Sequence, residues 1–220
     1  MTVEDPIEYD IEGISQTPIN AKIDMTFGRA LRAILRQDPD VVMIGEIRDL
    51  ETSEIAVQAS LTGHLVLATL HTNTAASAVS RLIDMGVESF LLSSTLIGVL
   101  AQRLIRKLCP LCKAKHTTID DALRKEFHIP KDAVIYRPVG CENCSFTGYK
   151  GRTGIHELLV VDEEMMRMIH NGAAEIDMEK YAIAHLGMQT LRMDGMRWVL
   201  DGQTSLEEVA TITQENYDDI

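Results

Sequence analysis

The four cysteines of this chain form two C-x-x-C pairs, Cys109 with Cys112 and Cys141 with Cys144. A thiolate pair of this spacing binds one metal ion from a tight turn, and two such pairs complete the tetrahedral sulfur shell of structural zinc. The gap between the pairs is longer than in the commonest zinc ribbons, so reduced thiols or disulfides are the alternative. The spacing predicts one zinc ion bound by all four sulfurs.

Two acidic segments carry the side chains that activate water or bind a divalent cation. Residues 41–46 are an apolar run that ends in Glu46, an arrangement by which P-loop enzymes bring a carboxylate beside Mg²⁺. Glu4, Asp5 and Glu8 lie in an extended segment, because Pro6 disfavours helix there. Glu8 is the candidate general base, and the alternative for both segments is a solvent-exposed acidic loop.

A third polar segment, residues 62–74, places His64 and His71 at opposite ends of an apolar run. Together with neighbouring hydroxyl and amide groups, these imidazoles are suited to sensing phosphate or holding water beside it. They are too far apart along a strand to chelate one ion. The alternative is that each is a capping or core histidine.

Short apolar runs alternate with helical patterns in the first hundred residues, which is typical of an α/β fold. Residues 41–44 and 65–70 are predicted strands, both buried on both faces. Helical spacing predicts helices over residues 26–36, 50–61, 74–85 and 89–108.

The rest of the chain divides into two parts. Periodicity fades over residues 109–152, as expected where a metal organises the fold. Residues 154–161 return to strand character, short helices follow to residue 220, and Thr204 to Glu207 reads as a capping box. We therefore predict three domains: residues 1–108 as an α/β core, 109–152 as a zinc subdomain, and 153–220 as a returning strand with a helical subdomain.

Composition excludes several classes of protein. The formal net charge of −12 repels phosphate backbones, and aromatic residues make up only 5% of the chain, so nucleic acid is not an expected partner. No signal peptide is recognisable, and no apolar run is long enough to span a membrane. These features predict a soluble cytosolic protein with reduced thiols.

Taken in order, three segments resemble known nucleotide-hydrolysis motifs. Residues 2–9, 35–49 and 62–73 resemble the Asp box, the Walker B motif and the His box of secretion ATPases. Residues 101–104, the two C-x-x-C pairs and residues 151–158 resemble the tetracysteine region of the secretion and assembly branch. Nearly the whole chain is thus similar to the type II secretion and type IV pilus assembly ATPase family (general secretory pathway protein E-like).

The resemblance implies part of a RecA-like P-loop ATPase core that uses ATP with Mg²⁺. Glu8 would be the general base for the attacking water, with Glu4 and Asp5 supporting the site. Glu46 would be the Walker B glutamate near Mg²⁺. The four cysteines would bind a structural zinc ion, because a closed sulfur shell leaves no position for substrate.

The resemblance also assigns basic residues and partners. His64 and His71 would link the nucleotide to subunit motion, and Arg32, Arg36 and Arg81 are candidate contacts to the γ-phosphate. Arg81 is the best placed, since it follows His71 by ten residues. The expected assembly is a homo-hexamer at the cytoplasmic face of the inner membrane, bound peripherally through secretion or pilus platform proteins.

One departure from the family pattern is decisive. No G-x-x-x-x-G-K-[ST] loop occurs in the chain, so the backbone groups and lysine that hold the β- and γ-phosphates are missing. In the family this loop precedes the Asp box, and we expect this chain to be part of a longer protein. Its sheet would then expose an edge and an apolar face. A zinc-stabilised interaction module without catalysis is the alternative, and the motifs do not separate type II secretion from pilus assembly.

Overall fold

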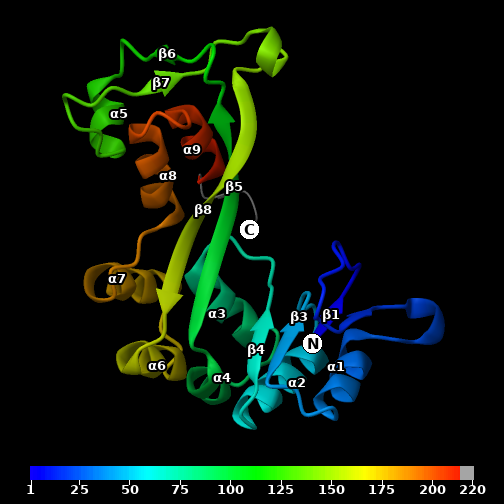
Figure 1. Ribbon diagram of the computed structural model, residues 1–220. Coiled ribbons are helices and arrows are strands. Elements are labelled where there is room, and N and C mark those ends of the chain that lie inside the picture. Colours follow the sequence, from blue (N-terminus) through cyan, green and yellow to red (C-terminus); the bar gives the residue numbers. More distant parts are fainter. Residues whose placement is uncertain (214–220) are drawn as a thin grey trace. The chain divides into compact units, whose positions relative to one another are not determined.

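The computed structural model describes residues 1–213 and divides the chain into two compact units (Figure 1). Unit 1 contains residues 1–99 and 160–182. Unit 2 contains residues 100–159 and the chain from residue 183 onward. The chain therefore leaves unit 1, builds most of unit 2, and returns to unit 1 before ending in unit 2. None of the described helices is long and apolar enough to cross a bilayer.

Unit 1 is built on a four-stranded parallel sheet of order β2-β1-β3-β4. Its strands are β1 (Thr2–Glu4), β2 (Gln16–Pro18), β3 (Val41–Ile44) and β4 (Leu65–Ala68). The predicted strand over residues 41–44 is confirmed, and the strand predicted over 65–70 ends two residues earlier. Because the strands are parallel, their carboxyl ends lie at one edge of the sheet.

The helices of unit 1 begin at well-defined caps. The side chains of Thr26, Asp49 and Thr74 each accept a hydrogen bond from the backbone N–H three residues later. The helices predicted over residues 26–36, 50–61 and 74–85 are therefore confirmed. The unit contains η1 (Ala21–Ile23), α1 (Phe27–Leu35), α2 (Leu50–Leu61), α3 (Ala75–Asp84), α4 (Ser89–Thr95), α6 (Glu163–His170) and most of α7 (Glu175–His185).

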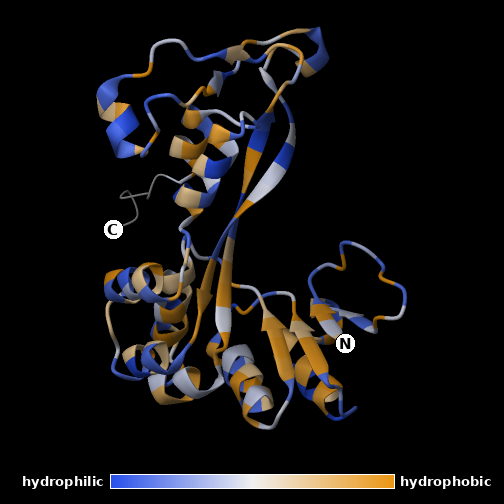
Figure 2. Ribbon diagram, turned by 60° about the vertical axis from the view of Figure 1, so that its left-hand side comes forward, coloured by the Kyte–Doolittle hydropathy of each residue, from blue (hydrophilic) through white to orange (hydrophobic). Residues whose placement is uncertain are grey.

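One face of the sheet carries the core of unit 1. Val42 and Ile44 are fully buried, in a cluster with residues of α1 and α2. Right-handed crossovers from β2 through α1 to β3, and from β3 through α2 to β4, place both helices on that same face. β3 and β4 are apolar along their length (Figure 2).

The opposite face of the sheet is open. Val41, Leu65 and Leu67 are 42%, 43% and 51% exposed, and the register places Val41 beside Leu65 and Met43 beside Leu67. The prediction that both strands are buried on both faces is therefore wrong for the described residues. The reason is topological, since successive crossovers in one direction cover only one face.

Unit 2 is organised by a long two-stranded ribbon of β5 (Gly98–Leu108) and β8 (Tyr149–Val160), which run in opposite directions (Figure 1). The strand predicted over residues 154–161 is confirmed. The helix predicted over residues 89–108 is wrong beyond Thr95, where α4 ends. Along β5, Leu100 and Leu104 are exposed whereas Ile105 is buried, an alternation that the pairing with β8 imposes.

Short elements and helices complete unit 2. β6 (Ala114–Lys115) and β7 (Tyr136–Arg137) form an antiparallel pair, and the helices are α5 (Asp121–Glu126), η2 (Glu142–Cys144), α8 (Leu191–Leu200) and α9 (Leu206–Ile212). The predicted helical C-terminal part is confirmed as far as residue 213, and residues 214–220 lie outside the described chain. The predicted capping box is shifted by one residue: Ser205 caps α9 by accepting from the N–H of Glu208, whereas buried Thr204 donates to the carbonyl of Arg106.

Candidate functional site

The carboxyl edge of the unit 1 sheet brings together polar side chains from three strands. Val3 pairs with Ile44, and Ile44 pairs with Ala68, so the segments that follow β1, β3 and β4 emerge side by side. These segments contain Asp5, Glu46 and His71 respectively. Clefts at this edge are the usual ligand sites of open parallel sheets.

Glu46 is the centre of this cluster. Its side chain is only 14% exposed, and it accepts a hydrogen bond from Arg48 and lies 3.3 Å from Nε2 of His71. The hydrogen bond from Arg48 is the main reason that the pKa of Glu46 lies below its ordinary value, with further lowering by His71. Glu46 is therefore an ionised, oriented carboxylate at neutral pH, whereas the His71 side chain is 92% exposed.

Arg48 is a site residue that the sequence patterns did not identify. Its guanidinium contacts Glu46 and also lies 3.9 Å from a carboxylate oxygen of Asp5. It thus connects the loop after β3 to the loop after β1. The only signal in the sequence was its position two residues after Glu46, in a segment for which a solvent-exposed loop was the alternative interpretation.

Backbone contacts hold these loops in place. A Cβ atom at Gly45 would lie 3.1 Å from the carbonyl oxygen of Val3 and 3.2 Å from Cα of Glu4, so any other residue at position 45 would push β1 away from β3. Thr69 donates its hydroxyl hydrogen to the carbonyl of Gly45, and the N–H of Ile47 donates to the carbonyl of Thr69 at 2.9 Å. The loop that carries Glu46 is therefore fixed from both neighbouring strands.

Glu4 and Glu8, two acids that the sequence analysis assigned to the site, have different surroundings. Glu4 accepts hydrogen bonds from Gln16 at 2.9 Å and from Thr2 at 2.5 Å, and these bonds lower its pKa. Glu4 therefore orders the start of the sheet. Glu8 is exposed on the loop after β1, and no contact joins it to Glu46 within residues 1–213.

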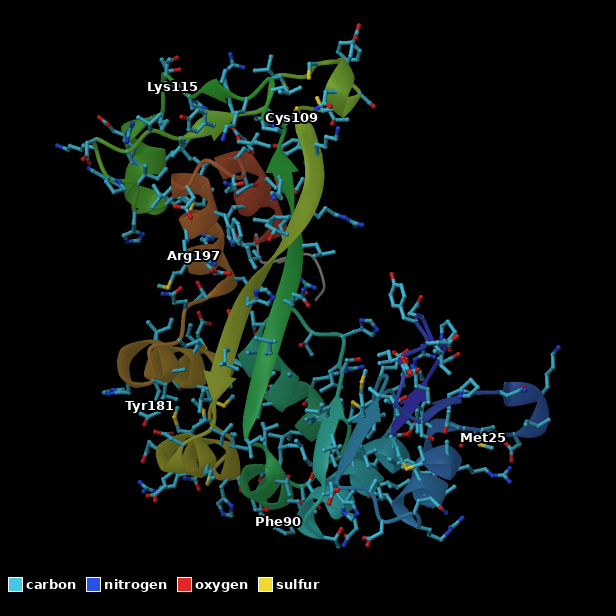
Figure 3. The ribbon with its side chains drawn as sticks, viewed as in Figure 1. Met25, Phe90, Cys109, Lys115, Tyr181 and Arg197 are labelled. Carbon is cyan, nitrogen blue, oxygen red and sulfur yellow. The ribbon has the colours of Figure 1, made fainter. Side chains whose placement is uncertain are left out.

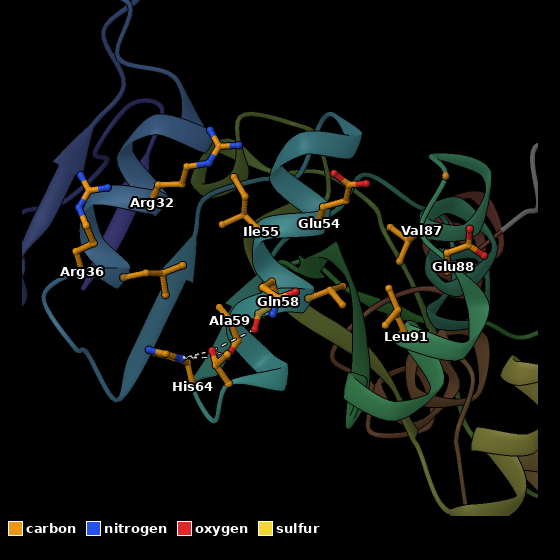
Figure 4. Close-up of a pocket in the computed structure, with 14 residues that line it drawn as sticks. Arg32, Arg36, Glu54, Ile55, Gln58, Ala59, His64, Val87, Glu88 and Leu91 are labelled. Atoms are coloured by element: carbon orange, nitrogen blue, oxygen red, sulfur yellow. Dashed lines mark hydrogen bonds between the residues drawn. The ribbon is translucent and has the colours of Figure 1, made fainter.

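Three predicted basic contacts lie together in a pocket away from Glu46. His64 precedes β4, and its Nδ1 lies 3.0 Å from the carbonyl oxygen of Ala59. Arg36 is the C-cap of α1 and precedes β3, and Arg32 pairs with Glu51 at 2.7 Å. Arg32, Arg36 and His64 line one pocket of about 740 Å³ between the helices (Figure 4). The structure brings these three residues together but does not bring them to Glu46.

Arg81 belongs to α3, the helix that begins soon after His71. It is exposed and lies about 9 Å along the helix axis from the first residue of α3, at 1.5 Å for each residue. Within the described chain it makes no side-chain contact with Glu46 or His71. It is available to a ligand or a second subunit on that side of the helix.

The four cysteines lie together at the end of unit 2 where β5 ends and β8 begins; Figure 3 labels Cys109. All four are free thiols, and their sulfurs lie within 4.8 Å of one another. The sulfurs of Cys109 and Cys141 are 3.9 Å apart, and those of Cys112 and Cys144 are 3.8 Å apart. Four zinc–sulfur bonds of about 2.3 Å in a tetrahedron place sulfurs about 3.8 Å apart. The residues therefore fit a zinc ion, and none of the four sulfurs is bonded to another in this structure.

Hydrogen-bond donors surround these sulfurs. Burial raises the pKa of Cys144, but the backbone N–H groups of Cys141 and Gly148 and the neighbouring sulfurs lower it to about 6. Asn143 donates from Nδ2 to the sulfur of Cys109 at 3.4 Å, which is the main reason that the pKa of Cys109 is lowered. Lys150 in turn donates to Oδ1 of Asn143 at 2.7 Å and orients its amide. Such donors support metal-bound thiolates.

Known proteins resemble this chain over nearly its whole length. The sequence profile of the family described as type II/IV secretion system protein matches residues 1–211. The chain is 59% identical over 217 residues to the type II secretion system protein E of Aeromonas hydrophila and 59% identical over 218 residues to the type II secretion system ATPase E of Vibrio cholerae serotype O1. Each match covers 98% of this chain but only 43% of the relative, so the chain spans less than half the length of either protein.

Solved structures share the fold. The chain superposes on the pilus retraction motor PilT with bound ADP with a TM-score of 0.68 and 28% identity, over 98% of this chain and 52% of PilT. The ATPase DotB of Legionella pneumophila matches with a TM-score of 0.66 and 22% identity, over 96% of this chain and 50% of DotB. The predicted α/β fold class, a partial RecA-like ATPase core with a tetracysteine part and a helical C-terminal part, is confirmed.

Proposed function

This chain belongs to the type II/IV secretion system protein family, and on that premise we propose that it is part of the ATPase subunit of a type II secretion system. The motor would couple ATP hydrolysis to assembly of the pseudopilus and to protein export. The named relatives at 59% identity favour secretion over pilus assembly. The likeness to PilT keeps a pilus-assembly motor as the second candidate.

The proposal rests on the cluster of Glu46, Arg48, Asp5 and His71 at the carboxyl edge of the sheet. An ionised carboxylate at the carboxyl edge of a parallel sheet is suited to orient water around Mg²⁺ bound to nucleotide. Arg48 holds Glu46 ionised and ties it to Asp5, and exposed His71 senses the γ-phosphate or transmits its loss. Glu8 approaches the attacking water as general base when its loop closes on bound nucleotide.

The phosphate-binding loop would come from a part of the longer protein that precedes the segment corresponding to β1. The open edge of β4 and the open face formed by Val41, Leu65 and Leu67 are suited to a further strand and helix carrying that loop. Without it, neither Glu8 nor Glu46 has a positioned substrate. We therefore propose that the 220-residue chain alone hydrolyses ATP negligibly.

The remaining expectations are part of the same proposal. Zinc bound by the four cysteines would be structural, since all four positions of its shell are filled by protein. The full-length protein would form a homo-hexamer and bind inner-membrane platform proteins from the cytoplasmic side. Arg32, Arg36 and His64 would act from the pocket that they line together, on a neighbouring subunit rather than on the nucleotide beside Glu46.

Kinetics of the full-length protein test the assignment. Glu8→Gln should lower the rate of ATP hydrolysis by at least about a hundredfold, the lower end expected for a lost general base, while a fluorescent ATP analogue still binds. Glu12→Gln, an exposed acid on the same loop, is the matched control and should retain normal turnover. Near-normal turnover in Glu8→Gln would transfer the role of base to Glu46. Near-normal turnover in Glu46→Gln as well would refute the proposed site.

A further inference from the structure

The four sulfurs of the cysteine cluster differ in the hydrogen bonds that they accept. Three of them accept N–H donors, which are Asn143 Nδ2 for Cys109, the backbone of Gly140 for Cys112, and the backbones of Cys141 and Gly148 for Cys144. Within residues 1–213, no N–H group donates to the sulfur of Cys141, which lies 3.9 Å from the sulfur of Cys109 and 3.8 Å from that of Cys144. An N–H donor stabilises a thiolate and lowers its nucleophilicity. The thiolate of Cys141 is therefore the most nucleophilic of the four.

Exposure to solvent separates the same sulfurs in a second way. Cys109 and Cys144 are buried, at 0% and 6% exposure, whereas Cys112 and Cys141 are partly exposed. A dissolved reagent therefore reaches Cys112 and Cys141 first. Of these two, only Cys112 accepts an N–H donor among the described residues. Exposure and hydrogen bonding thus both favour Cys141 as the sulfur that reacts with an electrophile.

A second thiol lies within reach of Cys141. The sulfur of Cys144 is 3.8 Å away, and the single turn η2 joins the two residues. A disulfide needs a sulfur–sulfur distance of about 2.05 Å, so a small movement within that turn suffices. A bond from Cys141 to Cys109 would instead tie together two loops that lie 32 residues apart in the chain. Cys144 is therefore the partner that the local geometry favours.

We propose that Cys141 is an oxidation site at which hydrogen peroxide opens the metal shell. The Cys141 thiolate attacks one peroxide oxygen, so that an S–O bond forms, the O–O bond breaks and hydroxide leaves with the electron pair. The Cys144 thiolate then attacks the sulfenic sulfur of Cys141, so that the S–S bond forms, the S–O bond breaks and a second hydroxide leaves. The two sulfurs together lose two electrons, the peroxide gains them, and two protons from solvent convert both hydroxides to water.

Oxidation of this pair removes two of the four thiolates that hold zinc. The remaining pair, Cys109 and Cys112, cannot complete a tetrahedral shell, so zinc is released. Because metal binding energy is folding energy, residues 109–152 loosen, and a thiol reductant together with zinc restores them. This chemistry requires bound zinc but not ATP hydrolysis, so it is independent of the nucleotide site at Glu46.

Peptide mapping of the zinc-loaded chain tests the proposal. Trypsin separates the two C-x-x-C pairs, the first in peptide 108–113 and the second in peptide 132–150. After limiting hydrogen peroxide and alkylation of the free thiols, peptide 132–150 should contain the first disulfide while peptide 108–113 is still fully alkylated. Zinc transfer to a chromophoric chelator should rise in step with that disulfide. A first disulfide in peptide 108–113, a bond between the two peptides, zinc release without a disulfide, or no zinc release would overturn the proposal.

Histidine variants provide the matched controls, because histidine can replace cysteine as a zinc ligand without supplying a thiolate. Cys141→His should retain zinc by elemental analysis, and peroxide should release that zinc at least about tenfold more slowly than from the parent chain. Cys112→His changes the other partly exposed ligand and should release zinc at nearly the parent's rate. Equal rates of zinc release from the two variants, or a slower rate from Cys112→His, would contradict the assignment to Cys141. The peptide map of the parent chain decides the question even where a variant binds no zinc.

Discussion

Replacing the buried Glu208 by glutamine should destabilise unit 2 more than the same exchange at an exposed glutamate of that unit. Glu208 on α9 is 5% exposed and accepts three hydrogen bonds from Arg106 on β5: one from the backbone N–H at 2.9 Å, one from Nε at 2.9 Å and one from Nη2. The Arg106 guanidinium also lies 4.2 Å from the centre of the Tyr149 ring. The carboxylate of Glu208 thereby joins the ribbon of β5 and β8 to α9.

The expected magnitude follows from these contacts. Hydrogen bonds to charged groups contribute about 1.5–3 kcal/mol, and removing one partner of a buried ion pair costs about 3–5 kcal/mol. The Arg106 side chain is 54% exposed, so water solvates it once the carboxylate is lost and the cost lies below that range. We expect Glu208→Gln to lower the free energy of unfolding of unit 2 by about 2 kcal/mol, which corresponds to a decrease in Tm of about 10 °C.

Tryptophan fluorescence during urea unfolding measures this effect directly. Trp198 is the one tryptophan of the chain, and it packs against the core of unit 2. Glu207→Gln is the matched control, because the Glu207 side chain is 57% exposed and should matter by less than about 0.5 kcal/mol. A double-mutant cycle with Arg106→Met isolates the pair. If Glu208→Gln is no more destabilising than Glu207→Gln, the assignment of a stabilising ion pair to this site is wrong.

The same pair predicts a pH dependence. Burial raises the pKa of Glu208, but the hydrogen bonds and charge of Arg106 outweigh it, so the pKa in the folded chain lies below 4.5. The pair therefore contributes its full stability above pH 4.5, and this contribution is lost as the pH falls through the lowered pKa. The stability difference between the parent and Glu208→Gln should shrink under acid conditions, which urea titrations at a series of pH values will measure.

Three further outcomes are expected. Purified chain should contain about one zinc per molecule by elemental analysis, and Cys144→Ser should make residues 109–152 sensitive to protease because metal binding energy is folding energy there; unchanged resistance would exclude a structural metal. Asn143→Asp should accelerate zinc transfer to a chromophoric chelator by at least about tenfold, since a carboxylate replaces the amide that donates to Cys109, and an unchanged rate would show that this contact is incidental. The 220-residue chain should show no ATP hydrolysis above background in a coupled assay; robust turnover that Glu46→Gln removes would show that phosphate binding does not need the missing loop.

Local signals in the sequence predicted the elements whose ends are set within a few residues. The boundaries of α2 follow from the Asp49 cap at one end and from Gly63 at the other, whose φ of 99° stops the helix. The two C-x-x-C pairs predicted the cysteine cluster for the same reason, since each pair occupies one tight turn. No local signal shows that the two C-x-x-C turns lie together. That prediction came from the preference of structural zinc for four thiolate ligands.

Strand β5 shows where local reasoning failed. Its apolar residues fit a continuing helix as well as a strand over residues 98–108, and the choice depends on pairing with β8 some fifty residues further along the chain. The openness of one sheet face was likewise decided by the handedness of the crossovers. Neither property is encoded in a window of ten residues.

For the candidate site, the sequence by itself placed Glu46 and His71 at the ends of predicted strands. It also identified the four cysteines by their spacing. Only the tertiary structure decided that Arg48 joins Glu46 to Asp5, and that His64 lies at the opposite edge from His71. It alone joined Arg106 to Glu208, 102 residues apart. The physical reason is that caps, turns and periodicity depend on neighbours along the chain, whereas ion pairs and sheet edges depend on segments that only the closed fold brings within contact distance.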